Sequence, residues 1–376
     1  MSEELEGALG LYYTISPLNI GSLVPSFAVG PPQGPDEDEW AFDERGKRFF
    51  SQTTPVQGFS DGIKAFTGIV SMVISSDYRV ILIDEPEAFL HPPLVRRLGK
   101  RLTDLAAERR GNIFASTHSP DFIMGCVQSG KRVNIVRLTY KKGVATARIL
   151  RADDLSAMMR DPLLRSTGVL SALFHEGVVV CEGDVDRAFY QEINERLLAG
   201  NQGGSADTLF LNAQNKSTVR RIIRPLREMG IPAAAIVDID ILNNRPDFTY
   251  LLQAAAVPKD LQLGWGQVKG QLYPKIKSAG KNIANLDHAS RETAEKLFND
   301  LAEYGIYVVP LGEVEDWLTT LSVVREKKEW LPRIFERMGT DPADENYVKP
   351  AEGDVWEFIR KLAMWITNPS RKGIPS

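Results

Sequence analysis

The chain has 376 residues, of which 43% are hydrophobic and 25% charged, which is the composition of a globular protein long enough for two or more domains. A formal net charge of −4 excludes a basic field over the whole chain, so any surface for nucleic acid must be local. Two cysteines and four histidines exclude a disulfide framework and a zinc site built from Cys and His.

The first 54 residues predict a loop or linker, because Gly, Pro and acidic residues are frequent there, above all over residues 29–39. Residues 55–150 then alternate helical and strand patterns and end in β-rich pieces. Residues 151–174 predict a helical linker. No apolar stretch reaches the roughly 18 residues that cross a membrane, and the sequence has no secretory leader pattern, so we expect a cytoplasmic protein without membrane contact.

A predicted strand over residues 80–84 ends in two carboxylates. Four apolar residues precede Asp84, and Glu85 follows it directly. In open α/β sheets, ligands bind at the carboxyl ends of the strands. An Asp at this position can hold Mg²⁺, and the next Glu can orient water for attack on a phosphate. The alternative is a buried strand that runs into an acidic turn.

Features on both sides of this strand favour a nucleotide site. Upstream, Ser60 and Gly62 begin a helix with a long apolar run. Downstream, a second strand starts at Asn112 and is followed by His118, for which a core histidine is the alternative. These motifs, in this order, resemble the second half of an ABC-type ATPase: signature, Walker B and switch histidine. The resemblance implies one set of ATP-site residues: Ser60, Gly62, Asp84, Glu85 and His118.

In that resemblance Ser60 and Gly62 face the γ-phosphate of ATP held by another subunit, and His118 senses the same phosphate. Asp84 holds the magnesium ion, and Glu85 is the catalytic residue for hydrolysis. The chain departs from the pattern because it contains no Gly-x-x-x-x-Gly-Lys-Ser/Thr loop to hold the phosphates. The nearest string ends at Arg132 where a hydroxyl is needed, and it follows a helix instead of a strand. We therefore expect a composite ATP site, completed in a homo-oligomer or by a subunit that supplies the P-loop.

A second series of strands and helices starts at residue 178. Its predicted strands are 178–181, 208–211, 233–237 and 306–311, and its predicted helices are 185–198, 217–229 and 290–304. Because strands that alternate with helices form mostly parallel sheets, this region predicts a Rossmann-like α/β domain over residues 175–320. We expect a long polar loop before the last of these helices and a helical C-terminal segment over residues 321–376.

Three predicted strands of this domain end in acidic residues. The first is followed by Glu182 and Asp186, the third by Asp238 and Asp240, and the last by Glu313 and Glu315. In an extended chain residues i and i+2 share a face, so the carboxylates of each of the last two pairs should point together. Carboxylates that converge at one sheet edge repel each other unless hard divalent cations neutralise them. The pattern predicts a site for Mg²⁺ or Mn²⁺, and two such ions form the usual clamp for phosphodiester cleavage.

Basic residues lie in the same region of the sequence as these acids. Lys216 follows the second predicted strand and could reach a phosphate or stabilise charge in a transition state. Seven further cations are candidates for contact with a DNA backbone: Arg220, Arg224, Arg227, Lys269, Lys275, Lys277 and Lys281. The arginines recur at helical spacing, and the lysines fall in the predicted polar loop between two acidic strand ends. A solvated helix face and a solvated loop are the alternatives.

The Glu-Gly string, the Asp-x-Asp string and the late acidic turn resemble the Toprim domain. An ATPase half followed by Toprim resembles the OLD family of ATP-dependent endonucleases, named for overcoming lysogenisation defect. This resemblance makes six acids metal-binding or catalytic: Glu182, Asp186, Asp238, Asp240, Glu313 and Glu315. It implies that Glu182 acts as acid/base or ligand and that Asp238 and Asp240 hold the metal.

Together the resemblances imply a two-domain α/β protein. A linker or partial ATPase region over residues 1–54 precedes a partial ABC-type ATPase domain over residues 55–150, and the Toprim domain and the C-terminal helical segment follow. The expected function is a metal-dependent DNA endonuclease that hydrolyses phosphodiesters without a covalent enzyme intermediate. The ATPase module would regulate it, in prokaryotic anti-phage defence or DNA processing. One alternative is a non-catalytic, nucleotide-sensing subunit that needs a partner. Another is a topoisomerase- or primase-like protein, and strand passage would need a positioned Tyr nucleophile.

Overall fold

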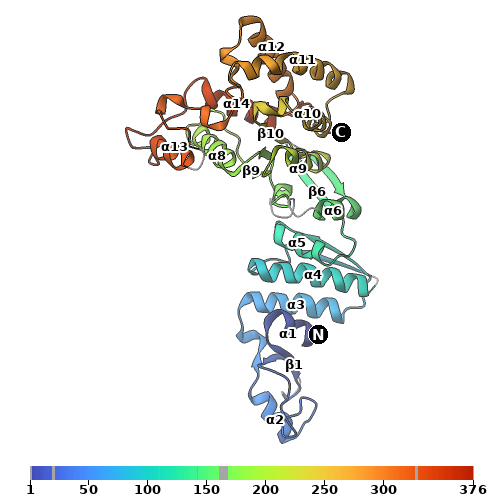
Figure 1. Ribbon diagram of the computed structural model, residues 1–376. Coiled ribbons are helices and arrows are strands. Elements are labelled where there is room, and N and C mark those ends of the chain that lie inside the picture. Colours follow the sequence, from blue (N-terminus) through green and yellow to red (C-terminus); the bar gives the residue numbers. More distant parts are fainter. Residues whose placement is uncertain are drawn as a thin grey trace. The chain divides into compact units, whose positions relative to one another are not determined.

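The computed structural model describes residues 2–18, 22–109, 111–141, 143–160, 168–326 and 329–375. The chain divides into two compact units, Met1–Ile135 with Arg151–Ser156 and Val136–Leu150 with Ala157–Ser376. Figure 1 follows the chain from the N-terminus in blue to the C-terminus in red. No helix within the described ranges is both long and apolar enough to cross a membrane.

The first unit begins with a small antiparallel sheet. Its elements are α1 (Ser2–Leu9), β1 (Tyr12–Ser16), β2 (Val24–Ala28), α2 (Glu44–Ser51) and β3 (Thr54–Pro55), with β2 paired to both other strands. Tyr13 and Phe27 are buried and contact edge to face. The prediction of a loop or linker over residues 1–54 is therefore wrong for the described part of that segment. Gly and Pro cluster between β2 and α2, and the apolar residues outside this cluster supply a core.

The rest of the first unit places a parallel pair of strands among three helices. The elements are α3 (Asp61–Ser75), β4 (Val80–Asp84), α4 (Pro92–Glu108), β5 (Asn112–Ser116) and α5 (Pro120–Gln128). Side chains such as Val70, Ile81 and Leu98 pack in one hydrophobic core. β4 and β5 run parallel, with Asp84 opposite Ser116. The carboxyl ends of both strands therefore lie side by side, where the ATP-site residues are predicted.

One face of the β4–β5 pair is open. Val80 and Leu82 are 53% and 75% exposed, and Phe114 is 62% exposed. Because successive side chains alternate between the faces of a sheet, these three lie on the same face as Asp84 and Ser116. Parallel strands are ordinarily covered on both faces. An uncovered apolar face therefore leads directly to the predicted magnesium residue.

The second unit is built around a four-stranded parallel sheet in the order β11–β10–β8–β9. Its strands are β8 (Gly177–Cys181), β9 (Thr208–Asn212), β10 (Ala233–Val237) and β11 (Ile306–Val308). Its helices are α8 (Asp184–Ala199), α9 (Lys216–Glu228), α10 (Arg245–Ala254), α11 (Lys259–Ser278), α12 (His288–Ala302), α13 (Trp330–Met338) and α14 (Asp354–Thr367). A separate pair of strands, β6 (Ile135–Lys141) and β7 (Val144–Leu150), comes earlier along the chain. The predicted α/β fold with a parallel sheet is confirmed.

Both faces of this sheet are covered. Every residue of β8 and β10 is buried. Val179 and Ile236 share one core cluster with Phe189 of α8 and Ile359 of α14. Burial on both faces explains why these strands are short, uninterrupted apolar runs in the sequence. It also confines polar side chains to the positions where each strand ends.

The prediction of a long polar loop before residue 290 is wrong, because this segment forms α10 and α11. Trp265, Leu272 and Ile276 are buried along α11 at helical spacing. The glycines and the proline within α11 lower its intrinsic helix propensity, and burial of this apolar stripe outweighs that cost. The predicted helical linker over residues 151–174 is helical over α6 (Ala152–Met159), and residues 161–167 lie outside the described residues.

Candidate metal and nucleotide sites

The sheet of the second unit has a topological switch point between β8 and β10. The chain leaves β8 to form β9 on one side and later returns to form β10 and β11 on the other. Open α/β sheets bind ligands outside the carboxyl ends of the strands at such a point. Glu182 directly follows β8, and Asp238 directly follows β10. The register, with Val180 opposite Ala235, brings both acids to this edge.

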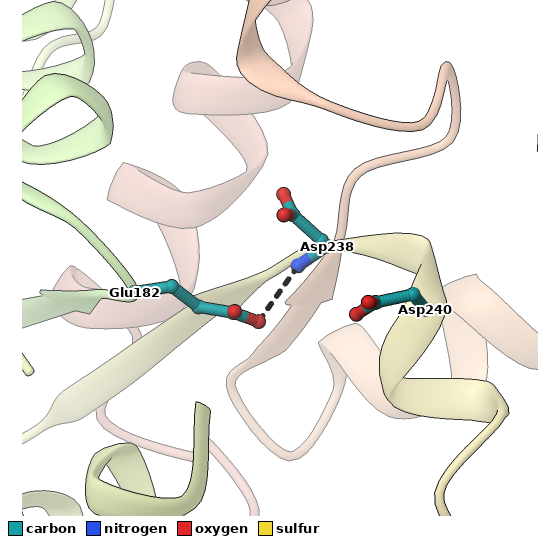
Figure 2. Close-up of side chains that lie close together, drawn as sticks. All are labelled: Glu182, Asp238 and Asp240. Atoms are coloured by element: carbon teal, nitrogen blue, oxygen red, sulfur yellow. Dashed lines mark hydrogen bonds between the residues drawn. The ribbon is translucent and has the colours of Figure 1, made fainter. Parts of the chain in front are cut away.

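Three carboxylates meet at the switch point. Glu182, Asp238 and Asp240 each place an oxygen within 4.8 Å of the others. The backbone N–H of Asp238 donates to Oε1 of Glu182 at 3.0 Å, which joins the end of β10 to the end of β8. Figure 2 shows this bond and the carboxylate of Asp240 pointing back toward Glu182. The structure thus brings together three of the six acids predicted for the metal site.

Burial and mutual repulsion oppose ionisation of these acids. Burial raises the pKa of Glu182 to about 7; the bond from Asp238 opposes the shift, and the charge of Asp240 adds to it. Burial raises the pKa of Asp238 to about 8, and the charges of Glu182 and Asp186 add to the effect. Buried like charges are unfavourable unless a cation compensates them. The cluster is therefore suited to hold positive charge.

Of the two carboxylate oxygens of Asp240, one is hydrogen-bonded and the other has no partner in the part of the chain that the structure describes. Its Oδ2 accepts from Nζ of Lys216 at 3.0 Å. Its Oδ1 is buried and has no hydrogen-bond partner among the described residues. Buried polar atoms almost always have a partner, so an unbonded oxygen inside a carboxylate cluster is a position for a ligand. A donor set of oxygens alone fits a hard divalent cation such as Mg²⁺ or Mn²⁺.

Asp240 reaches the cluster by a route that the sequence did not predict. The residues after Asp238 form a 3-10 turn over Ile239–Leu242, so the expectation of an extended chain is wrong here. A 3-10 helix has about three residues per turn, so positions two apart do not share a face. In Figure 2 the carboxylates of Asp238 and Asp240 leave the chain in different directions. The turn, rather than strand alternation, carries Asp240 toward Glu182.

Asp186 lies near the cluster but is not one of the three carboxylates that meet there. It lies in the first turn of α8, where Oδ2 accepts the backbone N–H of Gly183 at 2.9 Å. This contact orients the turn that follows β8. The charge of Asp186 contributes to the raised pKa of both Glu182 and Asp238. Its effect on the site is therefore electrostatic in the conformation seen here.

The late acidic turn is also a 3-10 turn, Val314–Asp316. The prediction that Glu313 and Glu315 share a face is therefore wrong. The charge of Glu313 adds to the raised pKa of Asp238, which places Glu313 beside the cluster. Glu315 is buried and, among the described residues, lies outside the group of three carboxylates. Of this pair, Glu313 is the one in electrostatic contact with the site.

Residues outside the predicted set hold this turn in place. Arg325 pairs with Glu313 at 3.6 Å and with Asp316 at 3.0 Å. Gly312 has a φ of 118°, and a Cβ there would lie 3.2 Å from the carbonyl oxygen of Lys281, so glycine is required. Trp317 donates from its indole to the hydroxyl of buried Tyr190 at 3.0 Å. No local motif marks Arg325, and sequence reasoning missed it.

The ends of β4 and β5 form the second candidate site. Oγ of Ser116 donates to Oδ1 of Asp84, which fixes this carboxylate at the strand end. Glu85 has a φ of 43°, a backbone conformation that residues other than glycine seldom adopt. Oε1 of Glu85 lies 3.8 Å from Nε2 of His118. The side chain of His118 is 83% exposed, so the alternative of a core histidine is wrong.

Glu87, which sequence reasoning did not select, joins the loops after β4 and β5. Its Oε1 accepts from Oγ1 of Thr117 at 2.7 Å and from the backbone N–H of His118 at 2.8 Å. Its Oε2 is buried and has no partner within the described ranges. In the sequence, only its place as the second acid of the Glu-Pro-Glu string could have pointed to Glu87 as a site residue. Glu87 therefore positions the segment that carries His118.

Ser60 and Gly62 lie at the start of α3, as predicted. Ser60 is the N-cap residue, and its hydroxyl makes no capping bond. A Cβ on Gly62 would lie 2.6 Å from the carbonyl oxygen of Phe89, so glycine lets this helix start approach the loop after β4. His91 caps α4, with Nδ1 accepting from the backbone of Leu94 at 3.4 Å, which is a structural role.

Two protein families match separate parts of the chain. The family described as "AAA domain, putative AbiEii toxin, Type IV TA system" matches residues 35–124, which include the site at the ends of β4 and β5. The family described as "Overcoming lysogenization defect protein-like, TOPRIM domain" matches residues 173–240, which include the carboxylate cluster. Together the two matches support an OLD-family architecture. An AAA-type ATPase domain precedes an OLD-like TOPRIM domain.

The chain is also similar to Old nuclease of Escherichia phage P2, with 24% identity over 175 residues. The match covers 44% of this chain and 28% of Old nuclease, so it spans less than a third of that relative. A solved chain from a study of ATP-driven dimerization and DNA stimulated activation of SMC ATPases has 16% identity and a TM-score of 0.29. That match covers 42% of this chain and 86% of the solved chain.

Two of the cations predicted to contact DNA are buried in the second unit. Arg227 is 1% exposed, and its guanidinium donates only to backbone carbonyls, including those of Ala233 and Tyr304. Lys269 is 6% exposed, and its ammonium lies over the ring of Phe248. The prediction that these two residues contact DNA is therefore wrong. Helical spacing alone did not separate a buried arginine from an exposed one.

The remaining cations are at least partly exposed. Arg220 and Arg224 lie along α9, and Lys275 and Lys277 lie along α11 instead of in a loop. Nζ of Lys275 donates to Oγ of Ser290 at 2.8 Å. Lys281 follows α11, and its backbone carbonyl faces Gly312 in the acidic turn. These positions keep all five available for contact with an anionic ligand.

Proposed function

We propose that this chain is a metal-dependent DNA endonuclease that hydrolyses phosphodiester bonds at the TOPRIM cluster. The observation that carries the proposal is the meeting of Glu182, Asp238 and Asp240 at the switch point of the parallel sheet. The matched TOPRIM family and the similarity to Old nuclease support a nuclease. On the same resemblance we place the activity in prokaryotic anti-phage defence or DNA processing.

Mg²⁺ or Mn²⁺ would be held by the three carboxylates, with the unbonded Oδ1 of Asp240 as one ligand. When bound, such ions polarise the phosphate and lower the pKa of a water molecule that attacks it. Asp186 and Glu313 lie close enough to act on these groups electrostatically and complete the negative surroundings of the site.

The residues around the metal site have separable roles. The bond from the backbone N–H of Asp238 fixes the carboxylate of Glu182 before any ligand arrives. Lys216 carries a positive charge beside Asp240 and can stabilise negative charge that develops on the phosphate. Burial lowers the pKa of Lys216, but its bond to Asp240 and the nearby acids raise the pKa overall and keep the ammonium charged.

A covalent strand-passage reaction has less support. Burial raises the pKa of Tyr190, and the charges of Asp186 and Asp238 add to the effect, so Tyr190 lies near the cluster. It is fully buried, and its hydroxyl is bonded to Trp317. A side chain in this position cannot attack a DNA phosphate, which favours hydrolysis by water over a covalent enzyme intermediate.

We further propose that the ATPase domain regulates cleavage through a composite nucleotide site. Asp84, Glu85 and His118 lie together at the ends of β4 and β5, and this sequence contributes no P-loop to them. The open face of Val80, Leu82 and Phe114 ends at Asp84. A polypeptide segment that carries a P-loop would cover this face and bring its phosphate-binding loop to Asp84. A second copy of the chain could then present Ser60 and Gly62 to the same nucleotide.

Incubation with supercoiled plasmid tests the proposed reaction. Mg²⁺ or Mn²⁺ should support nicking, and chelation should stop it. The nicked DNA should carry no covalently attached protein after denaturation. A covalent adduct would favour a topoisomerase-like reaction. Absence of nicking with either metal, and with a P-loop segment and ATP supplied, would favour a nucleotide-sensing subunit.

A further inference from the structure

A pocket of about 550 Å³ opens between α9, α10 and the start of α11, and we call it the α9–α11 pocket. Its lining includes Arg220, Arg221, Arg224, Glu228, Tyr250 and Lys259. None of the three clustered carboxylates lines it. The volume lies within the range of sites that hold small ligands. The pocket is therefore a feature of the TOPRIM-containing unit that the metal site does not explain.

The lining of this pocket carries excess positive charge. Arg224 pairs with Glu228, the one acid in the lining, at 3.0 Å. No acid within the described ranges forms an ion pair with Arg220 or Lys259. Cations gathered in a concave surface attract anions more strongly than the same cations spread over a convex one. The charge of the pocket favours a phosphate-bearing ligand.

Arg220 is held in position before a ligand arrives. Its guanidinium lies over the ring of Tyr250, 4.1 Å from the centroid. Its Nε donates to the backbone carbonyl of Ser217 at 3.1 Å. These contacts leave the terminal nitrogens without a hydrogen bond to the described residues, and a planar guanidinium matches the geometry of a phosphate. A fixed donor loses less side-chain entropy when it binds.

α9 also connects this pocket to the metal site. Lys216 contacts Asp240, and Arg220 and Arg224 follow at four-residue spacing on the same side of the helix. With about 1.5 Å of rise per residue, Arg220 and Arg224 lie about 6 and 12 Å along the axis from Lys216. One DNA strand advances about 3.4 Å per phosphate. The pocket thus lies within a few nucleotides of a phosphate held at the carboxylates.

We propose that the α9–α11 pocket is a second phosphate-binding site, which holds the backbone of a DNA strand within a few nucleotides of the position of cleavage. The inference rests on the proposed nuclease function for its ligand. It assigns Arg220 and Lys259 to direct phosphate contact and leaves Arg227 as a buried structural residue. Backbone contacts of this kind position DNA and carry no sequence code.

The test measures binding of a short labelled DNA duplex to the full chain in a chelating buffer, where no cleavage can occur. The variant combines Arg220→Ala with Lys259→Ala. The control combines Arg291→Ala with Lys296→Ala, two exposed cations of α12 outside the pocket, so that net charge changes equally. Loss of two phosphate contacts should make the slope of log affinity against log salt shallower by about 1.8. The control should change the slope by much less.

Equal slopes for the two double variants would overturn the inference. So would full competition by a mononucleotide at concentrations near the dissociation constant of the duplex, because the pocket would then bind a free nucleotide. Plasmid nicking distinguishes the two proposals. If the plasmid is not nicked but the pocket variant shows the shallower salt slope, the proposed nuclease function is wrong and the phosphate site stands. If the plasmid is nicked but the pocket variant has the same salt slope as the control, the proposed phosphate site is wrong and the nuclease function stands.

Discussion

Lys216 donates from Nζ to Oδ2 of Asp240 at 3.0 Å, and this bond joins the start of α9 to the turn after β10. Lys216 follows β9 and Asp240 follows β10, so the two residues meet only in the folded chain. Oδ1 of the same carboxylate has no partner among the described residues. Asp240 therefore has one oxygen bonded to a fixed ammonium and one oxygen that can bind a cation.

Replacement of Lys216 should separate metal binding from turnover. Lys216→Gln removes a charge that competes for Asp240 and that can stabilise the transition state. We expect the maximal nicking rate to fall about 10-fold or more, a loss in the range seen for electrostatic groups at reacting centres. The Mg²⁺ concentration for half-maximal rate should stay the same or fall. An unchanged maximal rate, with Lys296→Gln as the control, would show that Lys216 has no part in the reaction.

The metal-free protein should lose stability as pH rises. Glu182 and Asp238 have pKa values of about 7 and about 8 in the folded chain, above their ordinary values of 4.5 and 3.8. The folded state then binds more protons than the unfolded state within this window, so the free energy of unfolding falls between about pH 4 and pH 8. Thermal unfolding in chelator checks this prediction. Asp238→Asn and added Mg²⁺ should each flatten the dependence, and an equal slope in wild type and variant would contradict it.

Nucleotide turnover should require a phosphate-binding loop from elsewhere. The chain offers Asp84, Glu85 and His118 but nothing to hold the α- and β-phosphates. We expect the isolated chain to bind ATP weakly and to hydrolyse almost none. With a P-loop segment supplied in trans, Glu85→Gln should remove turnover while sparing binding. Steady hydrolysis by the isolated chain, lost in Glu85→Gln, would reveal a phosphate site within this sequence.

Arg227 should matter for stability and not for DNA contact. Arg227→Gln would remove the donor to several buried carbonyl groups, including those of Ala255 and Tyr304. Each unsatisfied buried group costs about 1–3 kcal/mol, so the variant should lose several kcal/mol in denaturant unfolding or fail to fold. Arg224→Gln, at an exposed position on the same helix, is the matched control. Equal stability of the two variants would contradict the structural role.

Strands and acids at strand ends could be predicted because they depend on local patterns. β10 is a run of apolar residues that ends at Asp238, and no tertiary information is needed to see this. The cluster of Glu182, Asp238 and Asp240 followed from the parallel order of the strands. The route of Asp240 did not, because a 3-10 turn replaced the extended chain.

The errors arose where burial decides the outcome. Helical spacing predicted an exposed Arg227, and the predicted polar loop implied an exposed Lys269, but tertiary packing covers both residues. Arg325 and Glu87 act through contacts with segments distant in sequence, so no spacing rule could select them. α11 forms despite its glycines because burial of Trp265 and Ile276 stabilises the helix.

The most direct test of the metal site compares nicking of supercoiled plasmid by Asp240→Asn and Asp184→Asn. Both substitutions remove one negative charge and preserve side-chain size, and Asp184 is an exposed residue at the start of α8. With both variants folded and Mn²⁺ supplied, Asp240→Asn should lower the rate about 100-fold or more, which corresponds to about 2.7 kcal/mol. Asp184→Asn should retain the wild-type rate. A wild-type nicking rate in folded Asp240→Asn would contradict the assignment of catalysis to this cluster.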